Sequence, residues 1–240
     1  MKKILCLFIF IACSCNGQNK NQVDICWDGF INNKIPVFIH YSIVNELVIG
    51  EITYQNTKEK KPIKLIGTIQ DKNSYRLLEF DNFGNITGIL LVTPNKTELN
   101  GTWISPKTGK ELKFKANKNE IVKIISDYKS NHNDIFGDYY YNYGKFKCNG
   151  NFNLIKNKNN LISFDVMAMG DGEVPNLAII ERDSIKLTGN SFIYKMPDTE
   201  NCRFKINFYK DFVYVKDLGG DCTGQFGMGA YIDGIYFKTK

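Results

Sequence analysis

From residue 26 onward the chain is a regular succession of short apolar segments separated by turn residues. Many segments alternate; in residues 112–115, Leu and Phe alternate with two lysines, which places the apolar side chains on one face of a strand. The breaks hold pairs such as Asn32-Asn33, Gly84-Asn85 and Pro94-Asn95, residue types that favour turns. Short strands at this spacing, without intervening helices, predict an all-β fold of antiparallel barrel-like or sandwich sheets.

The pattern divides the chain into two β-rich halves of similar size. The first half predicts a domain over residues 25–117, and eight strands in about 90 residues suit an up-and-down barrel. Its expected strands are Cys26–Ile31, Ile35–Tyr41, Leu47–Tyr54, Ile63–Thr68, Tyr75–Phe80, Ile86–Val92, Leu99–Ile104 and Glu111–Lys115.

The second half predicts a domain over residues 135–240, joined to the first by a linker over 118–134. In the linker, the apolar residues of 121–128 fit a short helix or an edge strand equally well. The expected strands of the second half are Gly137–Tyr143, Lys145–Ile155, Leu161–Met169, Leu177–Glu181, Ser184–Leu187, Ser191–Lys195, Cys202–Tyr209, Phe212–Lys216 and Tyr231–Lys238.

The N-terminus has the order of an export signal. Residues 1–15, MKKILCLFIFIACSC, combine two lysines, an apolar run and small residues, so we predict a signal peptide there and a polar tether over 16–24. The run from Ile4 to Ala12 is too short to span a bilayer as a helix, which needs about 20 residues. Composition agrees with a folded exported body, because 43% apolar and 23% charged residues exclude wholesale disorder.

The end of this leader resembles the lipobox of bacterial lipoproteins. Cys15 follows Ser14 and Cys13 follows Ala12, a cysteine after a small residue in each case. The sequence departs from the family where Leu is usual, three places before the cysteine. The resemblance implies acylation of Cys15, or alternatively Cys13, and a protein that is lipid-anchored to a membrane of the cell envelope, on the periplasmic or surface leaflet of the outer membrane.

Four cysteines remain beyond the leader, and an even number in an exported chain suggests disulfides. Cys202 and Cys222 flank an expected hairpin, so we predict that they are bonded. Cys26 and Cys148 are a second candidate pair only because they are the two cysteines left over, and the alternative is that either is a free thiol. A metal site is not expected, since the chain has no CxxC pair and only two histidines.

The charge balance argues against nucleic-acid binding. The formal net charge is +6, falling to +4 when Lys2 and Lys3 leave with the signal peptide, and there is no Arg-rich run. Catalytic signatures such as GxSxG, GxxxxGK[ST] and HExxH are absent from the sequence. His40, in a strand, and His132, in a polar loop, lack a partner that would orient a catalytic base, so we interpret both as structural or surface residues.

Two acidic groups have alternative interpretations. Glu79 and Asp81 lie on one face of a strand, as the paired acids of a glycosidase would, but a polar strand end is the favoured reading. Asp165, Asp171 and Glu173 are candidate calcium ligands, but their spacing does not match an EF-hand and a loop is the favoured interpretation. We therefore predict no cofactor and no catalytic residue.

Two features suggest a binding surface. Tyr139 and Tyr141 share one strand face, which is either a platform for a protein or glycan or, as favoured, part of the core. The loop from Gly219 to Gly229 offers backbone donors without side-chain obstruction, or its glycines merely permit tight turns. The glycines in question are Gly219, Gly220, Gly227 and Gly229.

The second half resembles the small all-β module of lysozyme-inhibitor-type lipoproteins. The likeness rests on Phe136-Gly137-Asp138-Tyr139-Tyr140, on the cysteine strand from Cys202, on Asp221-Cys222 followed by Phe226-Gly227-Met228-Gly229, and on Asp233-Gly234-Ile235-Tyr236. It departs from that family through Thr223-Gly224-Gln225, inserted after the cysteine. The first half, through Ile49-Gly50 and Gly101-Thr102-Trp103 among others, resembles a β-module of exported bacterial proteins that carries no assigned activity.

These observations together predict a membrane-anchored envelope lipoprotein that acts as a binding module and not as an enzyme. The resemblance implies a lysozyme-inhibitor-like role with a protein or glycan ligand in the envelope. The alternative is an envelope scaffold or glycan-binding lipoprotein without inhibitory activity, and an unrecognised hydrolase is the least favoured interpretation.

Overall fold

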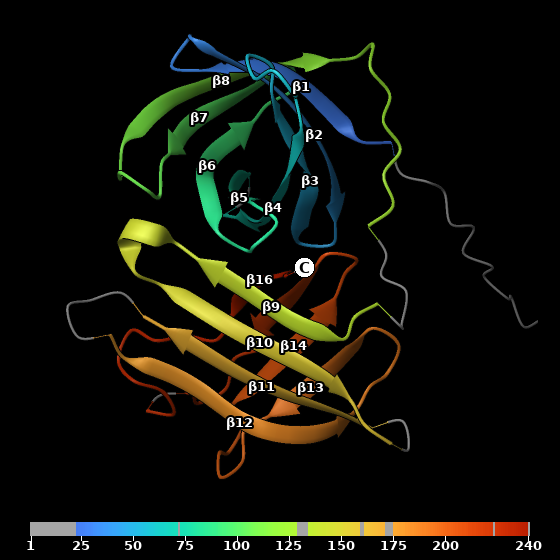
Figure 1. The fold of residues 1–240 in the computed structure, drawn as a ribbon, viewed down its shortest axis with the longest axis vertical. Helices are drawn as coiled ribbons and strands as arrows, with labels where there is room; N and C mark the ends of the chain where they lie inside the picture. The colour runs from blue at the N-terminus through green and yellow to red at the C-terminus, as the bar shows by residue number, and fades with distance from the viewer. Residues whose placement is uncertain are drawn as a thin grey trace, which may run out of the picture.

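The computed structural model of the chain describes residues 23–71, 73–128, 134–158, 161–170, 175–222 and 224–239. Two antiparallel sheets of eight strands account for most of it, which confirms the predicted all-β class with two barrel-like sheets (Figure 1). The predicted signal peptide with Cys13 and Cys15, together with His132, Asp171 and Glu173, lies outside the described residues.

The first sheet is a closed barrel. Each strand pairs with its neighbour in the chain, and β1 closes the ring by pairing with β8, with Gly29 opposite Ala116. The strands are β1 (Ile25–Ile31), β2 (Ile35–Val44), β3 (Leu47–Tyr54), β4 (Pro62–Gln70), β5 (Ser74–Phe80), β6 (Ile86–Pro94), β7 (Glu98–Ile104) and β8 (Glu111–Asn119). All eight expected strands are therefore present.

Period-two alternation builds the inside of this barrel. On β8, Phe114 is fully buried while Lys113 and Lys115 point to solvent, as the sequence pattern predicts. On β3, β5 and β6 both faces are largely buried, because the outer face packs against the second sheet. Leu77 faces the barrel interior, for example, whereas its neighbour Leu78 belongs to the core shared with the second sheet.

The second sheet has the strand order β12-β11-β10-β9-β16-β15-β14-β13, so that β12 and β13 are its edges. Its elements are β9 (Gly137–Asn142), the 3-10 turn η1 (Gly144–Phe146), β10 (Asn149–Lys156), β11 (Leu161–Met169), β12 (Leu177–Lys186), β13 (Ser191–Lys195), β14 (Arg203–Phe208), β15 (Phe212–Asp217) and β16 (Gly234–Lys238).

Three expectations for this sheet are wrong, the first being that the expected strand Tyr231–Lys238 begins only at Gly234. The expected strands Leu177–Glu181 and Ser184–Leu187 form one strand, β12, because a register shift opposite Asp165 absorbs the irregular Glu-Arg-Asp sequence without ending the pairing. The expected strand from Lys145 begins only at Asn149, since Lys147 adopts a left-handed conformation that ends the 3-10 turn.

The segment after β8 contains no helix in its described part, residues 120–128. It runs extended, and Ile125 forms a single antiparallel bridge with Val23. Of the two alternatives for the linker, the helix is wrong, and the edge strand is reduced to this one bridge.

The two sheets pack on each other through a common apolar core. Phe80 of the barrel stacks on Phe237 of the second sheet, with ring centroids 5.4 Å apart. Arg76 donates a hydrogen bond of 2.9 Å to the hydroxyl of Tyr143. The β5–β6 turn fits closely against β9: Gly84 has a φ of 80°, and a Cβ there would lie 2.6 Å from the carbonyl oxygen of Tyr140. Only glycine meets both conditions.

Candidate functional site

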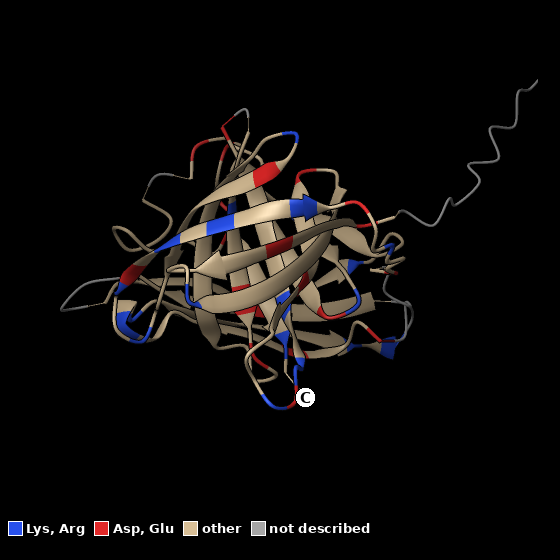
Figure 2. Cartoon of the chain, turned by 90° about the horizontal axis from the view of Figure 1, so that it is seen from above, with Lys and Arg blue, Asp and Glu red and all other residues tan. Residues whose placement is uncertain are grey.

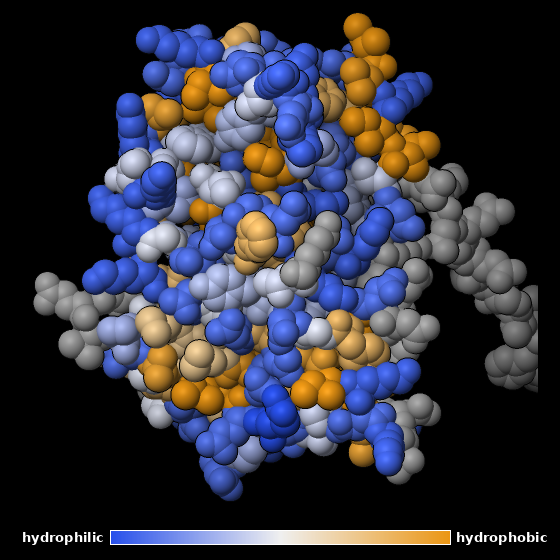
Figure 3. Space-filling model, in the orientation of Figure 1, coloured by the Kyte–Doolittle hydropathy of each residue, from blue (hydrophilic) through white to orange (hydrophobic). Residues whose placement is uncertain are grey.

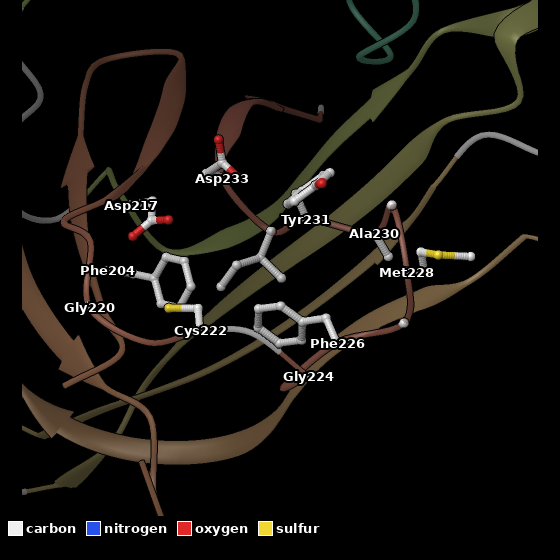
Figure 4. Close-up of a pocket in the computed structure, with 13 residues that line it drawn as sticks. Phe204, Asp217, Gly220, Cys222, Gly224, Phe226, Met228, Ala230, Tyr231 and Asp233 are labelled. Atoms are coloured by element: carbon white, nitrogen blue, oxygen red, sulfur yellow. The ribbon is translucent and has the colours of Figure 1, made fainter. Parts of the chain in front are cut away.

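The loop between β15 and β16, residues 218–233, folds back over the end of the second sheet and encloses a pocket of about 410 Å³ (Figure 4). Its walls combine aromatic and aliphatic side chains with two carboxylates and several backbone segments that lack side chains. The lining residues are Phe204, Asp217, Gly220, Cys222, Gly224, Phe226, Gly227, Met228, Gly229, Ala230, Tyr231, Ile232 and Asp233. We call this the acidic pocket.

A disulfide fixes the start of the loop. Cys202 and Cys222 are bonded, with Cα atoms 4.8 Å apart, which confirms the predicted pairing. Gly220 permits this close approach, because its φ is 100° and a Cβ would lie 1.9 Å from the carbonyl oxygen of Asn201. The bridge therefore ties the loop to the first residues of the β14 hairpin and shapes one wall of the pocket.

The glycines singled out in the sequence lie at or beside this pocket. Gly220, Gly227 and Gly229 line it, and Gly219 donates its N–H to Asp217 at 2.7 Å. Gly227 also has a structural reason to be glycine, since a Cβ would lie 2.6 Å from the side chain of Asn176. Its N–H donates to the carbonyl of Leu177, so the loop is joined to the start of β12.

Two carboxylates give the pocket its charge. Asp217 and Asp233 come from opposite ends of the loop, and Figure 4 shows both above an apolar floor that includes Phe204 and Phe226. Burial, and in addition the negative charge of Asp217, raise the pKa of Asp233 above its usual value. The pocket is therefore lined by two carboxylates of like charge on exposed residues, which a positively charged group would stabilise.

The rim of the pocket is exposed and apolar. Met228 is 89% exposed and Tyr231 is 67% exposed, so both are accessible to a large ligand. The carbonyl of Met228 accepts a hydrogen bond of 2.7 Å from Asn176, which fixes the backbone at the rim while its side chain points away from the fold. Sequence reasoning missed the two carboxylates and the rim, because their convergence depends on how the loop folds.

The suggestion that Tyr139 and Tyr141 form an exposed binding platform is wrong. Both are buried in the core of the second sheet, where the Tyr139 hydroxyl donates to the carbonyl of Ile135. The ring of Tyr141 packs edge-on against Tyr236 at 4.9 Å. The core interpretation is correct: the Tyr139 hydroxyl has a backbone partner, and the Tyr141 ring packs among other tyrosine rings.

The suggested second disulfide, between Cys26 and Cys148, is also wrong. Cys26 is buried in β1 of the barrel, and Cys148 lies beside β10 of the other sheet. Both are thiols: the Cys148 sulfur donates to the carbonyl of Phe146, and burial is the main cause that raises the pKa of Cys26.

The suspected acid pair separates in the structure. Glu79 points into the barrel and is 1% exposed, where it accepts hydrogen bonds from Trp103 Nε1 at 2.8 Å and from the Tyr54 hydroxyl at 3.0 Å. Burial raises the pKa of Glu79 to about 7, against these hydrogen bonds. Asp81 instead accepts from the backbone N–H groups of Phe83 and Asn85 in the turn. The two carboxylates therefore have separate structural roles.

His40 belongs to a polar network that the sequence did not reveal. Its Nδ1 lies 2.7 Å from Asp24 Oδ2, and its Nε2 lies 3.5 Å from Glu51 Oε2. Burial alone would lower the pKa of His40, but hydrogen bonds to both carboxylates raise it to about 9. The imidazole is therefore a cation between two anions at neutral pH, unsuited to act as a general base.

Asp24 is the centre of this network. Burial opposes ionisation, but hydrogen bonds from His40, Ser42 (2.5 Å), Ser126 (2.7 Å) and Tyr128 (2.9 Å) lower its pKa. The sequence placed Asp24 in the polar tether, because a single acid beside the first strand carries no signal of burial. The network joins the start of the barrel to the segment after β8.

Asp165, the described member of the suspected calcium group, pairs with Arg182 at 2.7 Å. Within the described residues, no three His, Cys, Asp or Glu side chains come together as metal ligands. Among those same residues there is no helix that is both long and apolar enough to cross a membrane. Comparisons with protein-family models, with curated proteins and with solved structures give no match to this chain.

Proposed function

We propose that the chain is an exported, lipid-anchored binding module whose ligand site is the acidic pocket. The observation that carries this proposal is the pair Asp217 and Asp233 facing an apolar floor beside an exposed rim. A pocket of this kind suits a lysine or arginine side chain presented by a partner protein, since the cation meets the carboxylates while its aliphatic stem packs on Phe204 and Phe226.

A basic enzyme such as a lysozyme is the partner class that we favour, in line with the resemblance of this half to lysozyme-inhibitor-type modules. The pKa of Asp233 is raised mainly by burial and in addition by the charge of Asp217, and this supports a cationic ligand because an incoming positive charge favours the ionised carboxylate. The net charge of +4 that remains after loss of Lys2 and Lys3 with the signal peptide disfavours long-range steering of a basic partner. Recognition therefore depends on the local field of the pocket.

The N-terminal sequence supports the location. A basic start, an apolar run and the cysteines Cys13 and Cys15 are the order expected of an acylated export signal. The second candidate function is glycan binding or scaffolding in the envelope without inhibition. It is favoured by one observation, the exposed aromatic ring of Tyr231 at the pocket rim, on which a sugar ring can stack.

The test compares charge at the pocket with charge elsewhere. Asp217→Asn combined with Asp233→Asn removes the pocket charges, and Glu181→Gln combined with Glu200→Gln removes two exposed charges at other positions. We expect the first variant to lose at least about tenfold in affinity for a basic lysozyme, a loss of 1.4 kcal/mol or more, while the second changes little. Binding is titrated by calorimetry, and inhibition is measured in parallel.

Equal losses in the two variants would mean that overall charge, and not the pocket, sets the affinity. Wild-type protein that binds peptidoglycan fragments but no lysozyme would favour the glycan alternative. Binding of neither would overturn the proposal, and turnover of the fragments would establish a hydrolase instead.

A further inference from the structure

A group of exposed apolar side chains lies where the chain enters the barrel. Ile121 is 91% exposed, Ile125 is 62% exposed, Val23 is 51% exposed and Val122 is 39% exposed. Single exposed apolar residues are ordinary, but a contiguous group marks a contact surface. Figure 3 shows apolar atoms gathered at the upper right, over the segment after β8. We call these four residues the entry patch.

The backbone holds the entry patch in place. Asn119 Oδ1 accepts hydrogen bonds of 2.9 Å from the N–H groups of both Ile121 and Val122. The N–H of Asp24 donates to the carbonyl of Ile124 at 2.9 Å, and Val23 is bridged to Ile125. Because these N–H groups already have partners, the patch meets an apolar environment with a reduced desolvation cost.

The charges around the patch are compatible with a lipid surface. Lys123 is exposed within the segment, and its long side chain can direct the ammonium group toward lipid headgroups. Two exposed acids also lie in the segment: Glu120, which pairs with Lys118 at 3.5 Å, and Asp127, which follows Ile125 by two residues. Contact with a membrane therefore depends mainly on the apolar side chains, with Lys123 as the cation of residues 120–128 that can reach the headgroups.

The position of the patch in the chain indicates which surface it contacts. Val23 is the first described residue, and eight residue steps separate it from Cys15. Covalent geometry limits that span to about 28 Å, less than the hydrocarbon thickness of one bilayer. If Cys15 carries the lipid anchor, as the proposed function holds, Val23 always lies within this distance of the anchored residue, and its bridge to Ile125 keeps the rest of the entry patch near it.

We propose that the entry patch rests on the phospholipid bilayer to which the chain is anchored and so fixes the orientation of the barrel. The inference rests on the proposed lipid anchor. It assigns the barrel to the membrane side and leaves the second sheet, which carries the acidic pocket, to face away from the patch. A second copy of the chain and the leader's own apolar run are the competing occupants, and both are outcomes of the test.

The experiment places a tryptophan in the patch. Ile121→Trp is compared with Ile193→Trp, a residue that is 53% exposed on β13 of the other sheet. Acylated full-length protein is reconstituted into phosphatidylcholine–phosphatidylglycerol vesicles with and without brominated acyl chains. After subtraction of the wild-type signal from Trp27 and Trp103, we expect emission of I121W to be quenched by roughly half and emission of I193W to be unchanged.

Each other result contradicts the proposal in an identifiable way. Wild-type protein that does not float with the vesicles would remove the anchor and this inference with it. Flotation without quenching of I121W would keep the anchor and overturn the membrane contact. A blue-shifted I121W signal in vesicle-free solution would show that protein covers the patch, a second copy if the shift depends on concentration and the chain itself if it does not.

Discussion

The barrel and the second sheet both have eight antiparallel strands, yet they close in different ways. In the barrel, β1 and β8 pair along seven-residue and nine-residue strands, so backbone hydrogen bonds complete the ring. In the second sheet, β12 and β13 remain edges, and aromatic side chains of β11 and β13 contact each other instead. Strand number therefore does not decide closure; register and tilt around the sheet do.

The open sheet uses side chains and a cross-link where the barrel uses its backbone. Phe164 of β11 lies 4.9 Å from Phe192 and 5.0 Å from Tyr194 of β13, ring centroid to ring centroid, across the gap. The exposed edge strand β12 carries Glu181, Arg182 and Asp183, and such charges discourage edge-to-edge association. The two halves should therefore be destabilised by different substitutions.

The largest expected effect compares two fully buried phenylalanines, Phe114 in the barrel and Phe164 in the second sheet. Each change to Ala removes a large core side chain and is expected to lower the free energy of unfolding by about 3–5 kcal/mol. Only Phe164→Ala also opens the gap, so it alone should speed amide exchange in β11 and β12. Denaturant unfolding and hydrogen exchange measure the two effects. Equal exchange profiles in the two variants would mean that the aromatic bridge does not hold the edges together.

The disulfide should matter only to the open sheet. Changing Cys202 and Cys222 to Ser releases a loop closed over a sequence separation of 20, which the chain-entropy account values at about 3 kcal/mol. We expect a lower melting temperature and faster proteolysis within residues 218–233. Because no barrel strand joins this loop, cleavage that begins in β1–β8 would contradict the assignment.

We expect Glu79, inside the barrel, to make the stability of the protein depend on pH. Glu79 has a folded pKa of about 7 against the ordinary value of 4.5, so the folded state retains a proton that the unfolded chain releases. Stability therefore falls as pH rises from about 4.5 to about 7, by about 3 kcal/mol for the full shift. Glu79→Gln should remove this slope. The free energy of unfolding of both proteins from pH 4 to 8 is the measurement, and parallel curves would exclude Glu79 as the source.

His40 should add a second slope at higher pH. Its folded pKa of about 9 lies above the ordinary 6.5, so its contribution is complete below pH 6.5 and is lost as pH rises through 9. The expected loss is below about 3 kcal/mol, since Glu51 at the outer end of the network is partly solvated. His40→Asn should flatten the curve between pH 6.5 and 9 without changing the Glu79 region. If the stability of His40→Asn keeps the wild-type slope between pH 6.5 and 9, the His40 network is not the source of that pH dependence.

Several features followed from the sequence because each depends on neighbours in the chain. The alternation in β8 placed Phe114 inside and Lys113 outside, and the turn residues located all eight barrel strands. The bond between Cys202 and Cys222 also followed, since both flank one short hairpin. The split of β12 failed because a register shift is a property of the pairing with β11, which the chain does not show locally.

What the sequence determined by itself is therefore the β-class, most strand positions, the turns and the local cross-link, all of which arise from residue types within a few positions of each other. Only the tertiary structure decided the closure of one sheet and not the other, the burial of Tyr139, the network around Asp24 and the placement of Asp217 and Asp233 around one pocket. These features join residues far apart in the chain or on different elements, and their energies come from desolvation and packing that exist only once the elements are assembled.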